Sequence, residues 1–377
     1  MHKSVRVLFD GWSLVYHPCS PAALHLLAIL ENLPEGVQPS VALPGSPPEW
    51  FPAVPFQILK IRTHDQFTWE QSSLPRLARR LEAQLVHLFL ASTPLLGRSL
   101  AVVSPSDFDP TGWPDPNHGE PSSGLRGRLR QSIRLGGLAR ARAIFWPNDL
   151  AIDNQLGAFQ SLPPCVYSSF TPAGHLASEK RENGSGRAWS ELRQLDLPET
   201  YLLFHGPASA PTINRLLSAW RWAAGPIGDY YPLLVLGFNS EERSHLTELA
   251  KTFDFGGTIR ALPGLSPLAV ALLYLGSTAL FHPAPEPLWG GPIRHALACG
   301  KPVVASQHRQ TSRLVGPAAY LVAGDDSRTL GAALITVVVE EEIAGKLAQA
   351  ARQRAAAWTG VAYSQALSAA YQKILES

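Results

Sequence analysis

Charged residues and long apolar runs are scarce in this sequence. Asp, Glu, Lys and Arg make up only 16% of the 377 residues, and their charges sum to +2. Such a balance gives no electrostatic basis for binding nucleic acid. No apolar run approaches the roughly 18–20 residues that span a bilayer, because Ser92, Pro94 and Arg98 interrupt the most apolar stretch, Leu85–Leu100. We therefore expect a globular protein without a membrane span or a nucleic-acid partner.

Cysteine is also rare. Cys19, Cys165 and Cys299 lie far apart and form neither a metal-binding pattern nor a disulfide framework, as is typical of a protein of the reducing cytoplasm. The apolar run near the N-terminus is too short for a secretory signal, which favours the same cytoplasmic location. No G-x-G-x-x-G motif follows a strand-like segment, and this argues against a dinucleotide-dependent oxidoreductase.

What the sequence does contain is a regular alternation of strand-like and helix-like segments. In the C-terminal half, the expected strands are Tyr201–Gly206, Tyr231–Gly237, Thr258–Leu262, Ala279–His282, Pro302–Ser306 and Ala319–Val322. The expected helices between them are Thr212–Ala224, Glu241–Phe253, Pro267–Leu275, Ile293–Cys299 and Ser327–Glu340. Strands that alternate with helices predict a parallel sheet covered on both faces.

The N-terminal half repeats this pattern more loosely. Its expected strands are Val5–Asp10, Ser40–Leu43, Phe56–Ile61, Leu85–Leu90, Leu100–Ser104, Ala143–Trp146 and Cys165–Ser168, and its expected helices are Pro21–Asn32 and Leu74–Gln84. The polar stretch His175–Ala188 predicts a domain junction. We therefore expect one α/β domain over residues 1–180, a second over 190–360, and a closing helix over 361–377.

Residues 279–306 form the most informative segment. Its apolar run ends in His282, and a lone carboxylate, Glu286, follows in a loop rich in Pro and Gly. The helix-like Ile293–Cys299, a Gly-Lys-Pro turn and the β-branched run 302–306 come next. In open α/β sheets, ligands bind at the carboxyl edge of the strands, so we expect Glu286 to lie at a ligand site.

This segment resembles the retaining glycosyltransferases of family four (group 1), in which an E-G-x-G loop precedes a helix and the run G-x-P-V-V-A-S. Four further segments match the family pattern in the correct order. They are Tyr201–Asn214, Leu233–Gly237, Thr258–Leu268 and Ala318–Asp325. The resemblance implies the GT-B fold, which consists of two Rossmann-like, doubly wound α/β domains with an interdomain cleft.

The resemblance also implies an activity. Family members transfer a sugar, with retention of configuration, from a nucleoside-diphosphate donor on the C-terminal domain to an acceptor on the N-terminal domain, and they require no metal. The leaving diphosphate develops negative charge that fixed cations must stabilise, and helix N-termini add partial positive charge. We thus expect a hexosyltransferase-type enzyme of glycan or glycolipid assembly, with no cofactor besides the donor substrate.

Several positions lack the chemistry that the family uses. Its diphosphate-binding Arg and Lys fall on Pro207 and Thr212, its second carboxylate falls on Arg294, and its His-Asp pair retains only Asp107. Losing one preorganised donor to a developing anion costs about 10²–10³ in rate. Two hypotheses stay open: an active glycosyltransferase with a rearranged donor site, and a catalytically degenerate homologue that acts as a binding or partner subunit.

The candidate site residues come from the ends of the expected strands and from the loops that follow them. The resemblance implies catalytic or orienting roles for Glu286 and Asp107. The expected donor-binding residues are His205, Gly206, Arg215, Gly237, Gly290, Gly291 and Arg294. Arg215 and Arg294 are the cations that could replace the missing pair, since a guanidinium matches oxyanion geometry. Trp289 places a bulky indole where the family has a small residue.

The expected partners follow from the same resemblance. They are a nucleotide-sugar donor, an unidentified glycan or lipid-linked acceptor and, in the degenerate case, a partner glycosyltransferase. The stretch Arg126–Arg142 carries six arginines, and a basic, partly apolar helix suits peripheral docking on an anionic inner membrane face. A solvated helix face explains the same stretch without a membrane.

Overall fold

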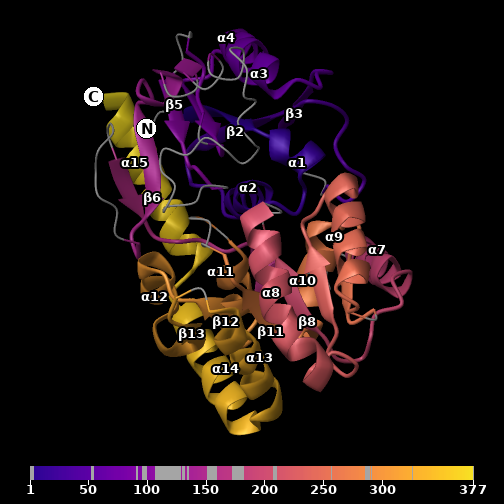
Figure 1. The fold of residues 1–377 in the computed structure, drawn as a ribbon. Coiled ribbons are helices and arrows are strands. Elements are labelled where there is room, and N and C mark those ends of the chain that lie inside the picture. Colours follow the sequence, from indigo (N-terminus) through magenta and orange to yellow (C-terminus); the bar gives the residue numbers. More distant parts are fainter. Residues whose placement is uncertain are drawn as a thin grey trace. The chain divides into compact units, whose positions relative to one another are not determined.

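The computed structural model divides the chain into two compact units. The N-terminal unit comprises residues 1–167, 287–290 and 358–377, and the C-terminal unit comprises residues 168–286 and 291–357. The structure describes residues 4–51, 55–90, 92–95, 100–106, 129, 132–133, 136–150, 159–171, 182–206, 210–255, 257–284, 289, 291–324 and 326–376. Each unit is described by itself below, with the element labels of Figure 1.

A seven-stranded parallel sheet forms the centre of the N-terminal unit, with the strand order β3-β2-β1-β4-β5-β6-β7. Its strands are β1 Val5–Asp10, β2 Val37–Leu43, β3 Gln57–Lys60, β4 Leu85–Leu88, β5 Leu100–Val103, β6 Ala143–Pro147 and β7 Phe159–Leu162. Its helices are α1 Trp12–Tyr16, α2 Pro21–Glu31, α3 Gln66–Thr68, the π-helix η1 Trp69–Ser73, α4 Leu74–Arg80 and α15 Gly360–Glu376. Ser20 caps α2 through its side chain and Pro21 starts it, which suits the first helical turn.

Two buried histidines, His25 and His87, each form a hydrogen bond with a tyrosine of α15 and so connect this helix to the rest of the unit. His25 lies between Ser106 Oγ (2.7 Å from Nδ1) and Tyr363 OH (2.9 Å from Nε2). His87 lies in the same way between Ser104 Oγ at 2.8 Å and Tyr371 OH at 2.6 Å. Burial lowers the pKa of His87 to about 3, so its ring stays neutral. The two phenols belong to α15, so the last helix is part of the N-terminal unit's polar core.

The C-terminal unit has a six-stranded parallel sheet with the order β10-β9-β8-β11-β12-β13. Its strands are β8 Leu202–His205, β9 Leu233–Leu236, β10 Ile259–Ala261, β11 Ala279–His282, β12 Val303–Ser306 and β13 Ala319–Val322. Its longer helices are α7 Glu182–Arg193, α8 Ala210–Ile227, α9 Ser240–Thr252, α10 Pro267–Gly276, α13 Ser327–Val339 and α14 Glu341–Ala355. Shorter ones are η2 Ser168–Phe170, α11 Pro292–Ala298, α12 Arg309–Val315 and η3 Gly316–Ala318.

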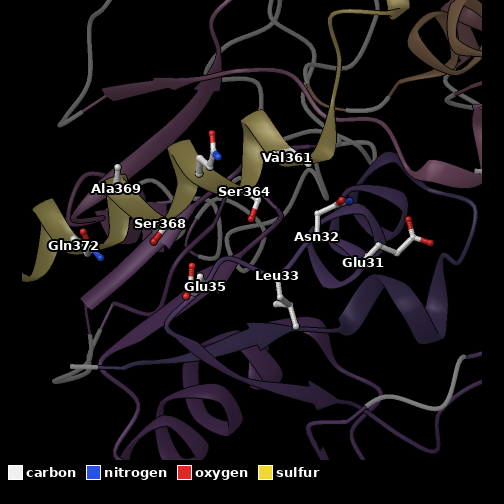
Figure 2. Close-up of a pocket in the computed structure, with 10 residues that line it drawn as sticks. Glu31, Asn32, Leu33, Glu35, Val361, Ser364, Ser368, Ala369 and Gln372 are labelled. Carbon is white, nitrogen blue, oxygen red and sulfur yellow. The ribbon is translucent and has the colours of Figure 1, made fainter. Parts of the chain in front are cut away.

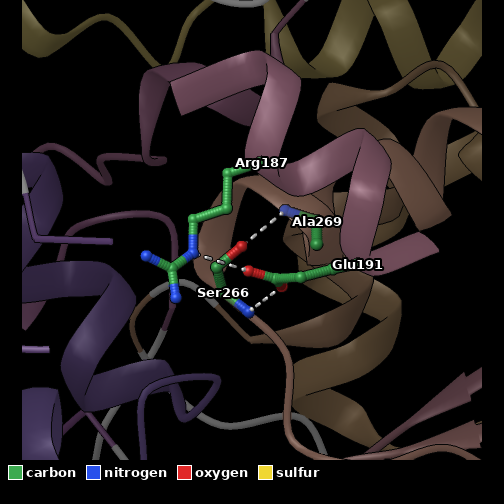
Figure 3. A network of polar contacts seen from close by, with 4 residues as sticks. All are labelled: Arg187, Glu191, Ser266 and Ala269. Atoms are coloured by element: carbon green, nitrogen blue, oxygen red, sulfur yellow. Dashed lines mark hydrogen bonds and ion pairs between the residues drawn. The ribbon is translucent and has the colours of Figure 1, made fainter. Parts of the chain in front are cut away.

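Side chains cap the starts of α9 and α10 in this unit. Asn239 and Glu242 form a reciprocal capping box at the start of α9, a pairing that satisfies two orphan backbone donors. The start of α10 is fixed twice (Figure 3): Ser266 Oγ accepts from Ala269 N, and the Glu191 carboxylate of α7 accepts from Ser266 N at 2.9 Å. Arg187 in turn lies 3.6 Å from Glu191. These contacts pin α7 against α10.

The two parallel sheets and their covering helices confirm the predicted α/β class. One strand prediction was wrong. The segment Cys165–Ser168 is not a strand, and β7 lies earlier, at Phe159–Leu162. Its polar Gln and Ser hid it, and the prolines at 163 and 164, which lack backbone N–H donors, end it. Part of the polar stretch His175–Ala188 belongs to α7, while residues 172–181 lie outside the described chain. The junction there, the domain limits and the cleft stay predictions.

Candidate functional site

The carboxyl edge of the C-terminal sheet contains a topological switch point. The strand order reverses between β8 and β11, because β9 and β10 extend the sheet to one side and β12 and β13 to the other. Ligands of open α/β sheets bind in the crevice at such a point. The two flanking strands end in His205 and His282, and Phe204 stacks on His282 with centroids 6.2 Å apart. This edge is therefore the candidate ligand site of the unit.

Two glycines, Gly206 and Gly237, pack closely against their neighbours at this edge. Gly237, just after β9, has φ +93, a conformation that side chains other than glycine's avoid. A Cβ there would lie 3.1 Å from His205 Cδ2 and 3.2 Å from Gly206 O. The His205 ring thus packs against Gly237, and its Nδ1 pairs with Tyr274 OH at 2.9 Å. The sequence predicted His205, Gly206 and Gly237 as site residues, and the structure brings them together.

Arg215 contributes a cation to the same edge. It lies in the second turn of α8, is half-buried, and its Nη1 donates to the carbonyl of Pro283 at 2.9 Å. Pro283 directly follows β11, so this contact places the guanidinium next to the switch point. Thr212, where the family has its lysine, is buried at 5% exposure and carries no charge. Arg215 is therefore the cation that the described part of the Gly206 region offers.

Helix α11 brings a second cation and a histidine. Arg294 is 0% exposed and His295 is 1% exposed. His295 stacks on Phe170 with centroids 4.0 Å apart and lies 6.5 Å from the His205 ring. Burial is the main cause that holds the pKa of His295 well below its usual value, and His205 and then Arg294 lower the pKa further. The ring is therefore neutral. Neither of its nitrogens has a hydrogen-bond partner among the described residues.

Further buried polar atoms without partners among the described residues lie at the end of β12 and just after it. Ser306 Oγ, His308 Nε2 and Thr311 Oγ1 are sealed from solvent and make no hydrogen bond within the described chain. Ser306 and Thr311 are 0% and 1% exposed. Such groups usually cost about 1–3 kcal/mol each, and native proteins retain them mainly where a water, ion or ligand completes them. The sequence did not predict these three residues, because nothing in a linear pattern shows that a polar atom lacks a partner.

The remaining predicted residues are placed as follows. Gly291 is the N-cap of α11 and offers no side-chain cap. Glu286, Gly290 and Asp107 lie outside the described residues, as do Pro207 and most of the arginines of Arg126–Arg142. Their predicted roles, and membrane docking through that basic stretch, stay predictions.

Trp289 does not lie free at the edge of the C-terminal sheet. It groups with the N-terminal unit and is 0% exposed. It stacks on His25 with centroids 4.6 Å apart, and its Nε1 donates to Phe145 O at 3.3 Å. The large indole of this loop is therefore a packing residue of the N-terminal core.

One open pocket of about 550 Å³ lies elsewhere in the N-terminal unit. Figure 2 shows it between α15, with Ser364 and Ser368, and the end of α2, with Glu31 and the turn that leads to Glu35. Because that turn leads into the first residue of β2, the pocket lies at the amino edge of the sheet. Ligands of this fold class bind at the opposite edge, so the pocket is not the candidate site.

Two searches of the described residues gave negative results. No group of three or more His, Cys, Asp or Glu side chains there is arranged to hold a metal ion. No helix in the same part of the chain combines the length and the apolar character needed to cross a membrane.

Known proteins share this architecture. Residues 173–354 match the family model described as Glycosyl transferases group 1. The sucrose-phosphate synthase from Thermosynechococcus elongatus superposes with a TM-score of 0.70 at 13% identity, over 99% of each chain. WaaG, a glycosyltransferase involved in lipopolysaccharide biosynthesis, gives 0.67 at 15% identity, over 97% of this chain and 98% of its own. Anabaena HepE in complex with UDP and glucose gives 0.63 at 16% identity, over 98% and 99%. No curated protein matches by sequence.

Residues 173–354 are therefore similar to the group 1 glycosyltransferases, and the two Rossmann-like units have the GT-B fold. The predicted fold is confirmed, and the match over residues 173–354 agrees with the family resemblance.

Proposed function

We propose that this protein transfers a sugar from a nucleoside-diphosphate donor, bound at the carboxyl edge of the C-terminal sheet, to a glycan or lipid-linked acceptor, with retention of configuration and without a metal. One observation carries the proposal: the half-buried guanidinium of Arg215 is fixed to Pro283 O at the switch point between β8 and β11. A fixed cation at that place suits the diphosphate that develops charge as the sugar leaves.

The surroundings of Arg215 suit such a ligand. Gly206 and Gly237 pack closely against Phe204 and His205, so the two loops lie together at the edge where the diphosphate is expected. Arg294 on α11 adds a second positive charge, which offsets the missing family cations. The unpartnered hydroxyls of Ser306 and Thr311 fit the hydroxyl groups of a ribose or sugar. The solved complex of HepE with UDP and glucose makes uridine diphosphate the first donor nucleotide to test.

The test is calorimetric titration of the full chain with UDP, GDP and ADP. We expect micromolar affinity for one of them, and a loss of at least tenfold in Arg215→Ala, because one charge-assisted contact disappears. Arg221→Ala is the matched control, since Arg221 is an exposed arginine of the same helix. It should bind like the unmodified protein.

A second titration, with the UDP conjugates of common sugars and detection of released UDP, separates the two hypotheses for this family member. Turnover supports the active enzyme, whereas tight binding without turnover supports the degenerate homologue that acts as a binding or partner subunit. Absence of binding by every nucleotide contradicts the proposal.

A further inference from the structure

Helices α8 and α13 pack together on one face of the C-terminal sheet. Their inward side chains, such as Trp220 of α8 and Leu334 of α13, share one apolar core with the strands. The helices approach so closely that a Cβ on Gly331 would lie 2.5 Å from Trp222 Cβ. Each follows a strand of the parallel sheet, β8 or β13, and packs along it, so the two helices run in the same direction.

The outward surface of this pair is formed by residues at helical spacing. Positions three or four residues apart lie on the same side of a helix, and one such series is exposed on each of the two helices. We define the α8/α13 face by these series and the charged residues beside them: Arg221, Trp222, Pro226 and Asp229 from α8 and the turn after it, and Arg328, Ala332, Ile335, Val339 and Glu340 from α13 and its C-cap. None of them belongs to the candidate ligand site, so the face has no part in the proposed function.

Apolar side chains run along this face. Trp222 is 50% exposed and Val339 is 60% exposed, and Ile335 between them is half-buried. The Arg328 guanidinium lies 5.4 Å from the centroid of the Trp222 ring, so the indole of α8 lies toward α13. An exposed tryptophan beside aliphatic residues is typical of protein interfaces. The face is therefore a candidate interaction surface.

The charges of the face are separated along the two helices. Arg328 lies in the first turn of α13, and Arg221 neighbours the tryptophan that Arg328 covers, whereas Asp229 and Glu340 follow the ends of α8 and α13. These side chains are exposed, and none forms an ion pair with a described residue. Asp326, a further carboxylate near Arg328, is the N-cap of α13 and accepts hydrogen bonds from its first turn. The face thus has a basic end and an acidic end.

The size of the face limits the strength of any contact. Because a helix rises about 1.5 Å per residue, the 13 residues of α13 span about 20 Å. Two adjacent helices, with axes about 8–10 Å apart, cover a width of about 20 Å. A face of about 400 Å² on each copy falls below the roughly 1,200–2,000 Å² in total that stable interfaces bury. We therefore expect a weak contact that forms at high protein concentration.

We propose that the α8/α13 face binds a second copy of this chain in a two-fold symmetric, antiparallel dimer. A two-fold contact joins the same patch on both copies. The basic end of one copy then lies on the acidic end of the other, and Trp222 packs against Val339 of the second copy. A partner of one charge sign, such as an anionic membrane, is attracted by one end of the face and repelled by the other. The inference goes beyond the proposed function and does not depend on it.

Sedimentation velocity of the full chain at about 1–200 µM tests for this dimer. We expect a monomer at the lowest concentrations and a dimer at the highest, with a dissociation constant on the order of 10–100 µM. Trp222→Gln should weaken association at least about tenfold, because a tryptophan is a frequent anchor of such contacts. Arg193→Glu is the control, since Arg193 is an exposed residue of α7, outside the face. It should associate like the unmodified protein.

A charge exchange tests the antiparallel arrangement. The double variant Arg221→Glu/Arg328→Glu makes both ends of the face acidic, and Asp229→Lys/Glu340→Lys makes both ends basic. Each double variant alone should stay monomeric at concentrations where the unmodified protein dimerises, because like charges then face each other. An equimolar mixture of the two should form a heterodimer.

Several results overturn the inference. They are a monomer at every concentration of the unmodified protein, undiminished association of Trp222→Gln, dimerisation of either double variant alone, and no association in the mixture. Circular dichroism checks that the double variants fold, and Trp222→Gln decides the test if one of them does not. UDP titration of the unmodified protein is a separate measurement, so a failed dimer leaves the proposed function standing.

Discussion

The two units share one strand topology and differ in the charge of their ligand edges. In both, the first strand lies at the centre and the order reverses between it and the fourth strand. Among the described residues, the N-terminal edge has Asp10 and Glu70, whereas the C-terminal edge has Arg215 and Arg294 beside the neutral His295. The fold therefore supplies two sheet edges of the same kind, and we expect side-chain charge to decide which ligand each one accepts.

The comparison extends to the buried polar groups. In the N-terminal unit, both ring nitrogens of His25 and of His87 have partners. In the C-terminal unit, neither nitrogen of His295 has one, and Ser306 and Thr311 also lack partners within the described chain. Networks in which every polar group is hydrogen-bonded rigidify a fold, whereas buried polar groups without partners are usually completed by a ligand or a water molecule. The first unit thus uses buried histidines for structure, and the second retains polar groups that suit binding.

The largest expected effect concerns Asp10. Its pKa is about 6 when folded, against an ordinary 3.8, so the folded state binds the proton more tightly than the unfolded chain. The stability that this proton binding contributes is present below about pH 4 and lost as pH rises through about 6. Between pH 4 and 7 the unmodified protein should lose about 3 kcal/mol relative to Asp10→Asn. Thermal unfolding of both proteins across this range measures the difference, and a constant difference contradicts the account.

The two glycines at the ligand edges give the next test. Gly11→Ala forces a Cβ to within 2.6 Å of Ala42 O, and Gly237→Ala forces φ +93 on a residue with a Cβ. Each should cost about 2 kcal/mol of stability. Only Gly237→Ala should also weaken nucleotide binding, because it displaces His205 at the C-terminal edge. Denaturant unfolding and calorimetry separate the two effects, and equal losses of affinity would break the distinction between the edges.

Tyr371→Phe tests the satisfied network of the N-terminal unit. It removes the partner of His87 Nδ1 and leaves a buried nitrogen unpaired, so stability should fall by about 1–2 kcal/mol. Nucleotide affinity should not change. Tyr230→Phe is the control, since Tyr230 is 76% exposed. Equal melting temperatures of Tyr371→Phe and the unmodified protein would show that the pairing contributes nothing.

Thr311→Val tests the unsatisfied groups of the C-terminal unit and should have the opposite sign. It replaces a buried hydroxyl without a partner by a methyl group of similar shape, so stability should rise by about 1 kcal/mol. Nucleotide affinity should fall at the same time. Thr336→Val is the control, because the Thr336 hydroxyl already donates to Ala332 O. A loss of stability in Thr311→Val would mean that its hydroxyl is satisfied within the protein.

The sequence predicts the interior strands of each sheet well. It predicts the residues at the ligand edges of the sheets less well. β1 and β11 lie where the apolar runs placed them, because buried parallel strands have continuous apolar sequences. His205 and Gly237 were predicted because each closes or follows such a run. Asp10 was not, since its main partner, Trp69, lies 59 residues away and contacts of that range leave no linear pattern.

Hydrogen–deuterium exchange with and without UDP tests most directly the claim that the two edges take different ligands. The account predicts that UDP protects peptides over residues 202–206, 210–215, 233–238 and 303–311 in the C-terminal unit. Peptides over residues 5–16 and 66–73 in the N-terminal unit should exchange at the same rate with and without UDP. Protection at the Asp10 edge, or none at the Arg215 edge, would contradict it.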